Sequence, residues 1–296
     1  MTPLTAGDAL TAWQFIPPVS AALIMLTAAY LSAVRVAAKR YPARAWPASR
    51  TAAFLAGLAV IAVATQGSVG SYDDVLFSAH MVQHLLLIMV APPLLIFGRP
   101  VTLLLRVTRG WTRARVRQVL KSPMVSFLTW PPVAVALYVA VVIGTHLSPL
   151  MNLVLENAAA HDAEHALYLV TGYLYFLPIV GSEPIRWRIS TLGRYLLLLV
   201  TMPVDTVVGV ILMLAPRELF SSYARAGRTW GPSLLADLHQ GGLIMFAGSD
   251  LIMTVLAAAL AVSVVRPHDR SRADLPGDLE AYNAYLASLD TTKGIS

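Results

Sequence analysis

The sequence predicts an all-α membrane protein, a bundle of seven transmembrane helices with the N-terminus outside and the C-terminus in the cytoplasm. Of its 296 residues, 57% are hydrophobic and only 13% are charged, and the mean hydropathy is +0.65. Soluble globular domains are far less apolar. A bilayer core ~30 Å thick needs ~20 apolar residues per helix. Seven segments fit that requirement, at residues 13–37, 51–67, 75–97, 124–146, 158–180, 192–215 and 237–265.

The basic residues predict the orientation of this bundle. The connections after the first, third and fifth segments, together with the tail, hold 19 of the 22 Lys and Arg residues. Only Arg217, Arg225 and Arg228 fall on the other side. Cytoplasmic loops are enriched in Lys and Arg, so this asymmetry indicates a multi-pass membrane protein whose basic loops lie in the cytoplasm. Its basic loops should contact anionic lipid, and nucleic acid is not an expected partner.

The first and third segments are bounded by distinctive residues. Segment 13–37 is not a typical signal peptide, because its positive charge follows the apolar stretch. Segment 75–97 begins directly after the Asp73–Asp74 pair, which we expect to cap that helix rather than to attract a metal. The Pro92–Pro93 pair predicts a kink in its inner half.

The later elements follow from similar signals. Residues 98–123 carry seven basic and no acidic side chains interleaved with apolar ones, which predicts an interfacial amphipathic helix. Segment 124–146 should be one helix kinked at Pro131–Pro132. Residues 1–265 form the predicted membrane domain, and 266–296 a cytoplasmic tail. Apolar residues at 3–4–3 spacing predict a short amphipathic helix in that tail, at Leu279, Tyr282, Leu286 and Leu289.

Six of the seven histidines fall on the outer side of this topology. His80 and His84 are four residues apart, so they share one helix face, and His161 and His165 repeat that spacing in the fifth segment. The other two are His146, at the end of the fourth segment, and His239, at the start of the seventh.

Such a cluster indicates a metal centre, because histidine is the commonest metal ligand. Ionisable residues in membrane segments are costly and usually functional. Affinity at imidazole sites peaks at Cu(II), and methionine thioethers suit Cu(I). With no cysteine present, thiolate sites are excluded. We expect Asp162, Glu164 and Asp237 to orient the imidazoles from a second layer. Asp205 and Asp250, in the sixth and seventh segments, are candidates for an ion or proton step.

Other interpretations of the histidines stay open at this point. They could hydrogen-bond water at the interface, or relay protons. A membrane b-type cytochrome would ligate haem b through two helices, for example by His84 and His165. A metal transporter would need polar groups toward the cytoplasm, where only Asp205 and Asp250 qualify. A retinal protein is argued against, since no lysine lies mid-membrane, and no hydrolase arrangement can be recognised.

Several motifs resemble one known family. They are residues 78–87 (SAHMVQHLLL), 91–95 (APPLL) and 98–100 (GRP), His146 with Pro149, residues 161–172, and Asp237 with Gly241–Gly242. Together they resemble the polytopic CtaG family of cytochrome c oxidase assembly factors, from about Val75 to Asp250. The chain departs from that pattern at His239 and Phe246.

The resemblance implies a function and partners. The protein would be a multi-pass protein of the bacterial inner membrane and not an enzyme. It would aid the maturation of a haem–copper oxidase, with oxidase subunits as partners and copper as cargo at a periplasm-facing site. His80, His84, His161 and His165 are the favoured ligands. The sequence leaves open a periplasmic copper donor and a homodimer.

Overall fold

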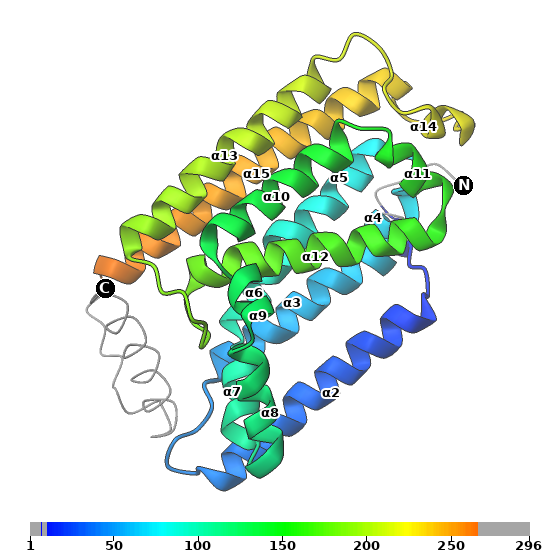
Figure 1. The fold of residues 1–296 in the computed structure, drawn as a ribbon. Coiled ribbons are helices and arrows are strands. Elements are labelled where there is room, and N and C mark those ends of the chain that lie inside the picture. Colours follow the sequence, from blue (N-terminus) through cyan, green and yellow to red (C-terminus); the bar gives the residue numbers. More distant parts are fainter. Residues whose placement is uncertain (1–6, 8–10, 266–296) are drawn as a thin grey trace.

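The computed structural model describes residue 7 and residues 11–265, and all regular secondary structure in that part of the chain is helical (Figure 1). The elements are α2 (Pro17–Arg40), α3 (Ala48–Gln66), α4 (Ser68–Tyr72), α5 (Phe77–Leu85), the π-helix η1 (Leu86–Val90), α6 (Ala91–Phe97), α7 (Pro100–Val107), α8 (Gly110–Leu120), α9 (Pro123–Leu128), α10 (Pro131–His146), α11 (Leu150–Glu156), α12 (Ala158–Val180), α13 (Thr191–Met213), α14 (Ser221–Arg225) and α15 (Leu234–Val265).

The all-helical membrane fold is confirmed, whereas the count of seven spans is not. Five described stretches are long and apolar enough to cross a membrane: Pro17–Arg40, Ala48–Tyr72, Phe77–Val107, Thr191–Met213 and Leu234–Val262. The pair α10 and α11, bent by 72°, is a sixth if it counts as one span. Helix α12 has 23 residues, but the polar side chains near its start lower its hydropathy. The seventh span and the orientation of the termini therefore stay predictions, and the predicted tail helix lies outside the described residues.

The fourth predicted segment is not one kinked helix. It is divided into α9 and α10, and Trp130 between them is extended, with φ −68° and ψ 123°. A residue that precedes proline is disfavoured in the α conformation, and proline suits the first position of a helix. Pro131 therefore starts α10. Similarly, residues 98–123 form two short helices, α7 and α8, where a single interfacial helix was predicted.

The third segment contains a π-helical turn before its proline pair. Pro92 has no N–H to donate to the carbonyl of Ile88, and its ring crowds that carbonyl. The chain widens into η1 there, and the structure packs α12 against the same turn. A Cβ added to Gly172 of α12 would clash with the Ile88 carbonyl oxygen. Glycine at this position thus lets α12 approach the helix that carries His80 and His84.

The other helices pack around the third span, which comprises α5, η1 and α6. Helix α15 packs along α13 and α5, while α12 packs on α6, η1 and α10. A Cβ on Gly242 of α15 would lie 2.5 Å from the Met213 nitrogen and 2.7 Å from the Gly209 oxygen. The backbones of α13 and α15 are therefore in direct contact. Helix α2 lies at the edge of the bundle (Figure 1), and only 11% of its apolar window is buried.

Candidate metal centre

The structure brings histidines from three helices together at one end of the bundle. His80 and His84 of α5 face α12, which contributes His161, Glu164 and His165, while His146 comes from the end of α10. We call these six residues the histidine–glutamate cluster: His80, His84, His146, His161, Glu164 and His165. Their imidazole rings pack against one another: ring centroids are 4.3 Å apart for His80–His84, 5.3 Å for His80–His161 and 4.4 Å for His161–His165.

Glu164 lies between the two histidines of α5. Its Oε2 is 3.4 Å from Nε2 of His80 and 3.4 Å from Nε2 of His84. The i, i+4 spacing explains the pair, because both imidazoles project from one face of α5. The sequence predicted Glu164 as a residue behind the ligands, but the structure puts its carboxylate among them.

The hydrogen bonds around His146 fix the position of the protons. Nδ1 of His146 lies 2.8 Å from the Val142 carbonyl oxygen, so this nitrogen is the donor and Nε2 is the acceptor. Nδ1 of His84, 3.2 Å from that Nε2, must then donate its hydrogen. In neutral His84 the remaining nitrogen, Nε2, is an unprotonated acceptor that faces the Glu164 carboxylate. Two acceptors at this distance require a cation or a proton between them.

The cluster has many buried polar atoms without hydrogen bonds. Within the described residues, seven such atoms belong to it: both ring nitrogens of His80, Nε2 of His84, His161 and His165, and both carboxylate oxygens of Glu164. Native proteins leave few buried polar groups unpaired. Single ligand atoms of His80, His161 and Glu164 lie within 4.8 Å of one another. This donor set of neutral imidazoles and one carboxylate fits a transition metal.

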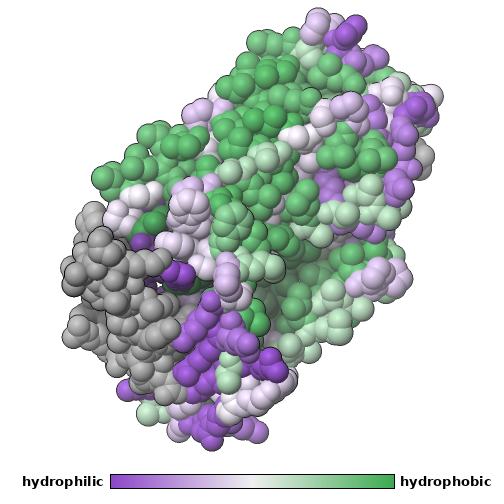
Figure 2. Space-filling view, in the orientation of Figure 1, coloured by the Kyte–Doolittle hydropathy of each residue, from purple (hydrophilic) through white to green (hydrophobic). Residues whose placement is uncertain are grey.

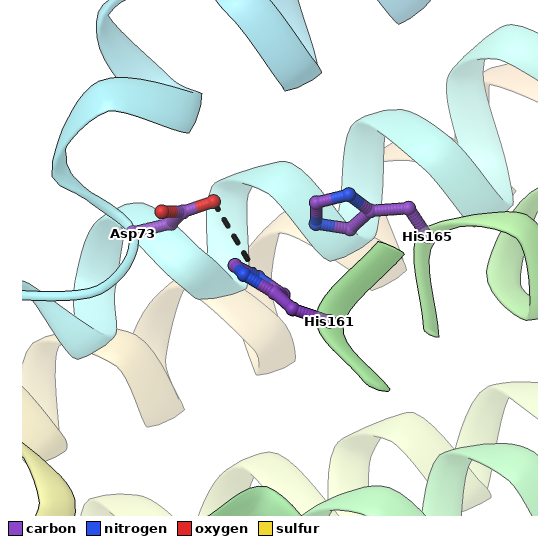
Figure 3. Close-up of side chains that lie close together, drawn as sticks. All are labelled: Asp73, His161 and His165. Carbon is purple, nitrogen blue, oxygen red and sulfur yellow. Dashed lines mark ion pairs between the residues drawn. The ribbon is translucent and has the colours of Figure 1, made fainter. Parts of the chain in front are cut away.

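A second group of ligand atoms involves Asp73, in the loop between α4 and α5. Asp73, His161 and His165 also offer atoms within 4.8 Å of one another, and Figure 3 shows both imidazoles beside the carboxylate. Oδ2 of Asp73 is 3.6 Å from Nε2 of His161 and accepts a 2.6 Å hydrogen bond from Gln83. Burial raises the pKa of Asp73 to about 7, although His80 and the Gln83 hydrogen bond oppose the shift.

Three predicted residues lie outside the cluster. Asp237 accepts hydrogen bonds from the Phe77 and Ser78 amides and the Ser78 hydroxyl, so it caps α5. The cap expected from Asp73 or Asp74 is thus supplied by Asp237, because the loop turns Asp73 toward Gln83. His239 is 2.9 Å from the Ala215 carbonyl oxygen, and Asp162 is exposed.

The carboxylates of the sixth and seventh predicted segments lie deeper. Asp205 accepts a 2.9 Å hydrogen bond from Tyr138, and Asp250 accepts a 3.1 Å hydrogen bond from Thr206. A cavity of about 10 Å³, room for about one water, is lined by both Asp205 and His84. This small cavity thus lies between the cluster and Asp205.

Sequence reasoning missed two neighbours of the cluster and favoured another role for a third. Asp73 and Gln83 form its outer wall, and Tyr168 stacks on His84 with ring centroids 3.9 Å apart. Gln83 lies inside the His80–His84 motif, and Tyr168 follows His165 by three residues, so both share a helix face with a predicted ligand. That periodicity was an available signal. For Asp73, the sequence allowed metal attraction but favoured helix capping.

Comparisons with known proteins agree with the motifs. A family model described as "Cytochrome c oxidase caa3 assembly factor" matches residues 28–267. Uncharacterised proteins of Mycobacterium bovis and Mycobacterium tuberculosis are each 32% identical over 97% of this chain and 46% of their own length. One of Mycobacterium leprae is 29% identical over 94% of this chain and 45% of its own. The chain thus spans about half the length of these curated relatives. No solved structure matches.

Proposed function

Because the chain belongs to the cytochrome c oxidase caa3 assembly factor family, we propose that it binds copper at the histidine–glutamate cluster and aids insertion of the metal into the oxidase. The family points to a non-catalytic role and to cytochrome c oxidase as the partner. The cluster supplies a reason for copper to be the cargo.

One observation carries the proposal. The neutral tautomer of His84 directs an unprotonated Nε2 at the Glu164 carboxylate, 3.4 Å away, inside a region where seven polar atoms are buried without hydrogen bonds. A bound cation removes this repulsion and supplies the absent partners. Among divalent first-row metals, an imidazole-rich site binds Cu(II) most tightly.

The location of the cluster suits delivery to an extracytoplasmic copper centre. Basic residues gather at the opposite end of the bundle, which the positive-inside rule assigns to the cytoplasm. We therefore propose a bacterial inner-membrane protein whose cluster faces the periplasm. His80, His84, His161, His165 and Glu164 are the proposed ligands. His146 holds His84 in the required tautomer.

The experiment is elemental analysis and a visible spectrum of detergent-purified protein loaded with copper. We expect bound copper in the wild type, its loss in His84→Ala/His165→Ala, and its retention in His239→Ala. The last variant is a matched control, because His239 is bonded to a backbone carbonyl away from the cluster. Equal copper in the wild type and the double variant would refute the site.

The same spectrum tests the cytochrome alternative. A Soret band that is present in the wild type and absent from the double variant would indicate that these histidines bind haem b and not copper. Copper uptake into sealed proteoliposomes would instead indicate a transporter, and Asp205→Asn should then abolish uptake. Neither alternative has an observation in its favour comparable to the unpaired ligand atoms.

A further inference from the structure

The ligand atoms of the candidate metal centre form two groups that share one histidine. The inner group is His80, His161 and Glu164, and the atoms of this group lie within 4.8 Å of one another. The outer group, Asp73, His161 and His165, satisfies the same distance. We propose that the outer group is a separate metal site, the outer site, through which copper enters and leaves the inner group. This division of the ligands rests on the proposed copper function and extends it to the route of the metal.

The two groups differ in their access to water. The side chains of His80 and Glu164 are 0% and 2% exposed, whereas the side chain of His161 is 17% exposed. Of the six residues in the histidine–glutamate cluster, only His161 and His165 are partly exposed, and both belong to the outer site. An ion that arrives from water therefore meets the outer ligands before the inner ones.

The outer site lies at a hydrophilic end of the molecule. Asp73 belongs to the loop between α4 and α5, and His161 belongs to the first turn of α12. Figure 2 shows hydrophilic side chains gathered at the end of the bundle that carries α11 and α14, beyond the hydrophobic band of the visible face. A hydrated ion can thus approach the outer site from this end.

Hydrogen bonds hold Asp73 in position as a ligand. Its Oδ2 accepts a 2.6 Å hydrogen bond from Nε2 of Gln83, which also donates to the Ala64 carbonyl oxygen at 3.0 Å. The backbone carbonyl oxygen of Asp73 accepts a 3.0 Å hydrogen bond from the Tyr223 hydroxyl of α14. Hydrogen bonds of this kind orient the ligands of metal sites. Although Asp73 lies in a loop, its carboxylate is therefore directed toward the two histidines of α12.

The outer site supplies donor atoms that suit copper. Nε2 of His161 is 3.6 Å from Oδ2 of Asp73, and the Nε2 atoms of His161 and His165 are buried without hydrogen bonds. Figure 3 shows the three side chains together. Imidazole ligands favour Cu(II) among the divalent first-row metals. Since His84 adds a fourth ligand only to the inner group, the inner group should hold the ion more tightly than the outer site.

His161 connects the two positions of the ion. Its ring stacks on the ring of His80, with centroids 5.3 Å apart and an interplanar angle of 7°, and the His165 ring is 4.4 Å away. An ion bound to His161 can exchange its other outer ligands for the inner ones, one at a time. No electron is transferred and the ion keeps its charge, because each exchange replaces one donor lone pair by another.

The test compares rates with affinity in the full chain purified in detergent. Stopped-flow mixing would follow Cu(II) as it moves from a chromophoric chelator to the protein, and from the loaded protein to a stronger chelator. A competition titration would give the Kd. We expect Asp73→Asn to slow loading and release by about tenfold each, with a Kd within about threefold of the wild type. A ligand used only during transfer affects both rates equally and leaves the equilibrium unchanged. Asparagine keeps an oxygen that can accept the Gln83 hydrogen bond, so the loop should stay in place.

Matched variants decide whether the outer site exists. Asp74→Asn removes the same charge from the neighbouring, exposed position and should change each rate by less than about twofold. His165→Gln is a second outer variant and should slow both rates as Asp73→Asn does. Unchanged rates in Asp73→Asn, equal slowing in Asp74→Asn, or a Kd raised as much as in Glu164→Gln would overturn the outer site in a protein that still binds copper. A wild type that binds no copper would refute the proposed function, and the outer site with it.

Discussion

Replacement of Glu164 by glutamine should weaken copper binding by about 100-fold. The substitution keeps the shape of the side chain and removes its charge. The ligand atoms of His80, His161 and Glu164 lie within 4.8 Å of one another, so an ion placed between them would be at most about 2.8 Å from each. At an effective dielectric constant of ~20, a unit charge at that distance contributes about 6 kcal/mol. Burial of the charged carboxylate costs free energy that the neutral glutamine avoids, and this offsets several kcal/mol of the loss. About 3 kcal/mol remains, which is ~100-fold in Kd.

The matched control for this prediction is Asp162→Asn. It removes the same charge from the same helix, two residues away, but from an exposed position. A screened surface charge should change the Kd by less than about fivefold. The assay is competition for copper against a chromophoric chelator of known affinity, with both variants in the same detergent. If the two variants weaken binding equally, or if Glu164→Gln binds as tightly as the wild type, Glu164 is not a ligand.

Three further predictions concern stability in detergent. Burial raises the pKa of Glu183 to about 7, above its unfolded value of ~4.3. The folded state therefore keeps the proton on Glu183 to a higher pH than the unfolded state does. The wild type should lose stability relative to Glu183→Gln as pH rises from about 4.5 to 7. Melting temperatures of both proteins at pH 5 and pH 8 check this, and a difference between them that stays constant with pH would contradict it. Gly172→Ala should lower the unfolding free energy, measured by urea titration, by about 2 kcal/mol or more, because the added Cβ meets a backbone carbonyl. In the same titration Gly144→Ala should be neutral or slightly stabilising, because no atom lies within 4 Å of the added Cβ. Asp237→Ala removes the cap of α5 and should cost about 1–2 kcal/mol in the same titration, and an unchanged midpoint would mean that the cap contributes nothing.

The parts of the fold that follow a helical period were predictable. His80 with His84, and His161 with His165, lie on common faces because 3.6 residues make a turn. Their meeting across two helices required only that both pairs lie near the same membrane surface. His239 shows the limit of this reasoning. It starts the right helix, but the rotation of α15 about its axis, set by glycine contacts with α13, directs it to the Ala215 carbonyl.

The missed features depend on tertiary contacts. Asp73 was expected to cap α5, but Asp237, which follows Phe77 by 160 residues, occupies that position. The cavity lined by Arg50, Arg99 and Arg194 combines residues of four separate segments, and the sequence indicated only that this end is basic. The break at Pro131 was visible as a proline pair. Whether such a pair kinks a helix or starts one depends on the residue before it, and Trp130 is extended here.

The π-helical turn η1 has a consequence for how the third span can vary. A π-turn holds one residue more than an α-turn, and one residue rotates a helix by about 100°. The π-turn winds that additional residue into a wider turn, so deletion of a single residue within Leu86–Val90 would restore a regular helix while α5 and α6 keep nearly the same relative rotation. The third span can therefore change its length by one residue at this point. The face of α5 that carries His80 and His84 and the face of α6 that packs on α3 would keep their directions.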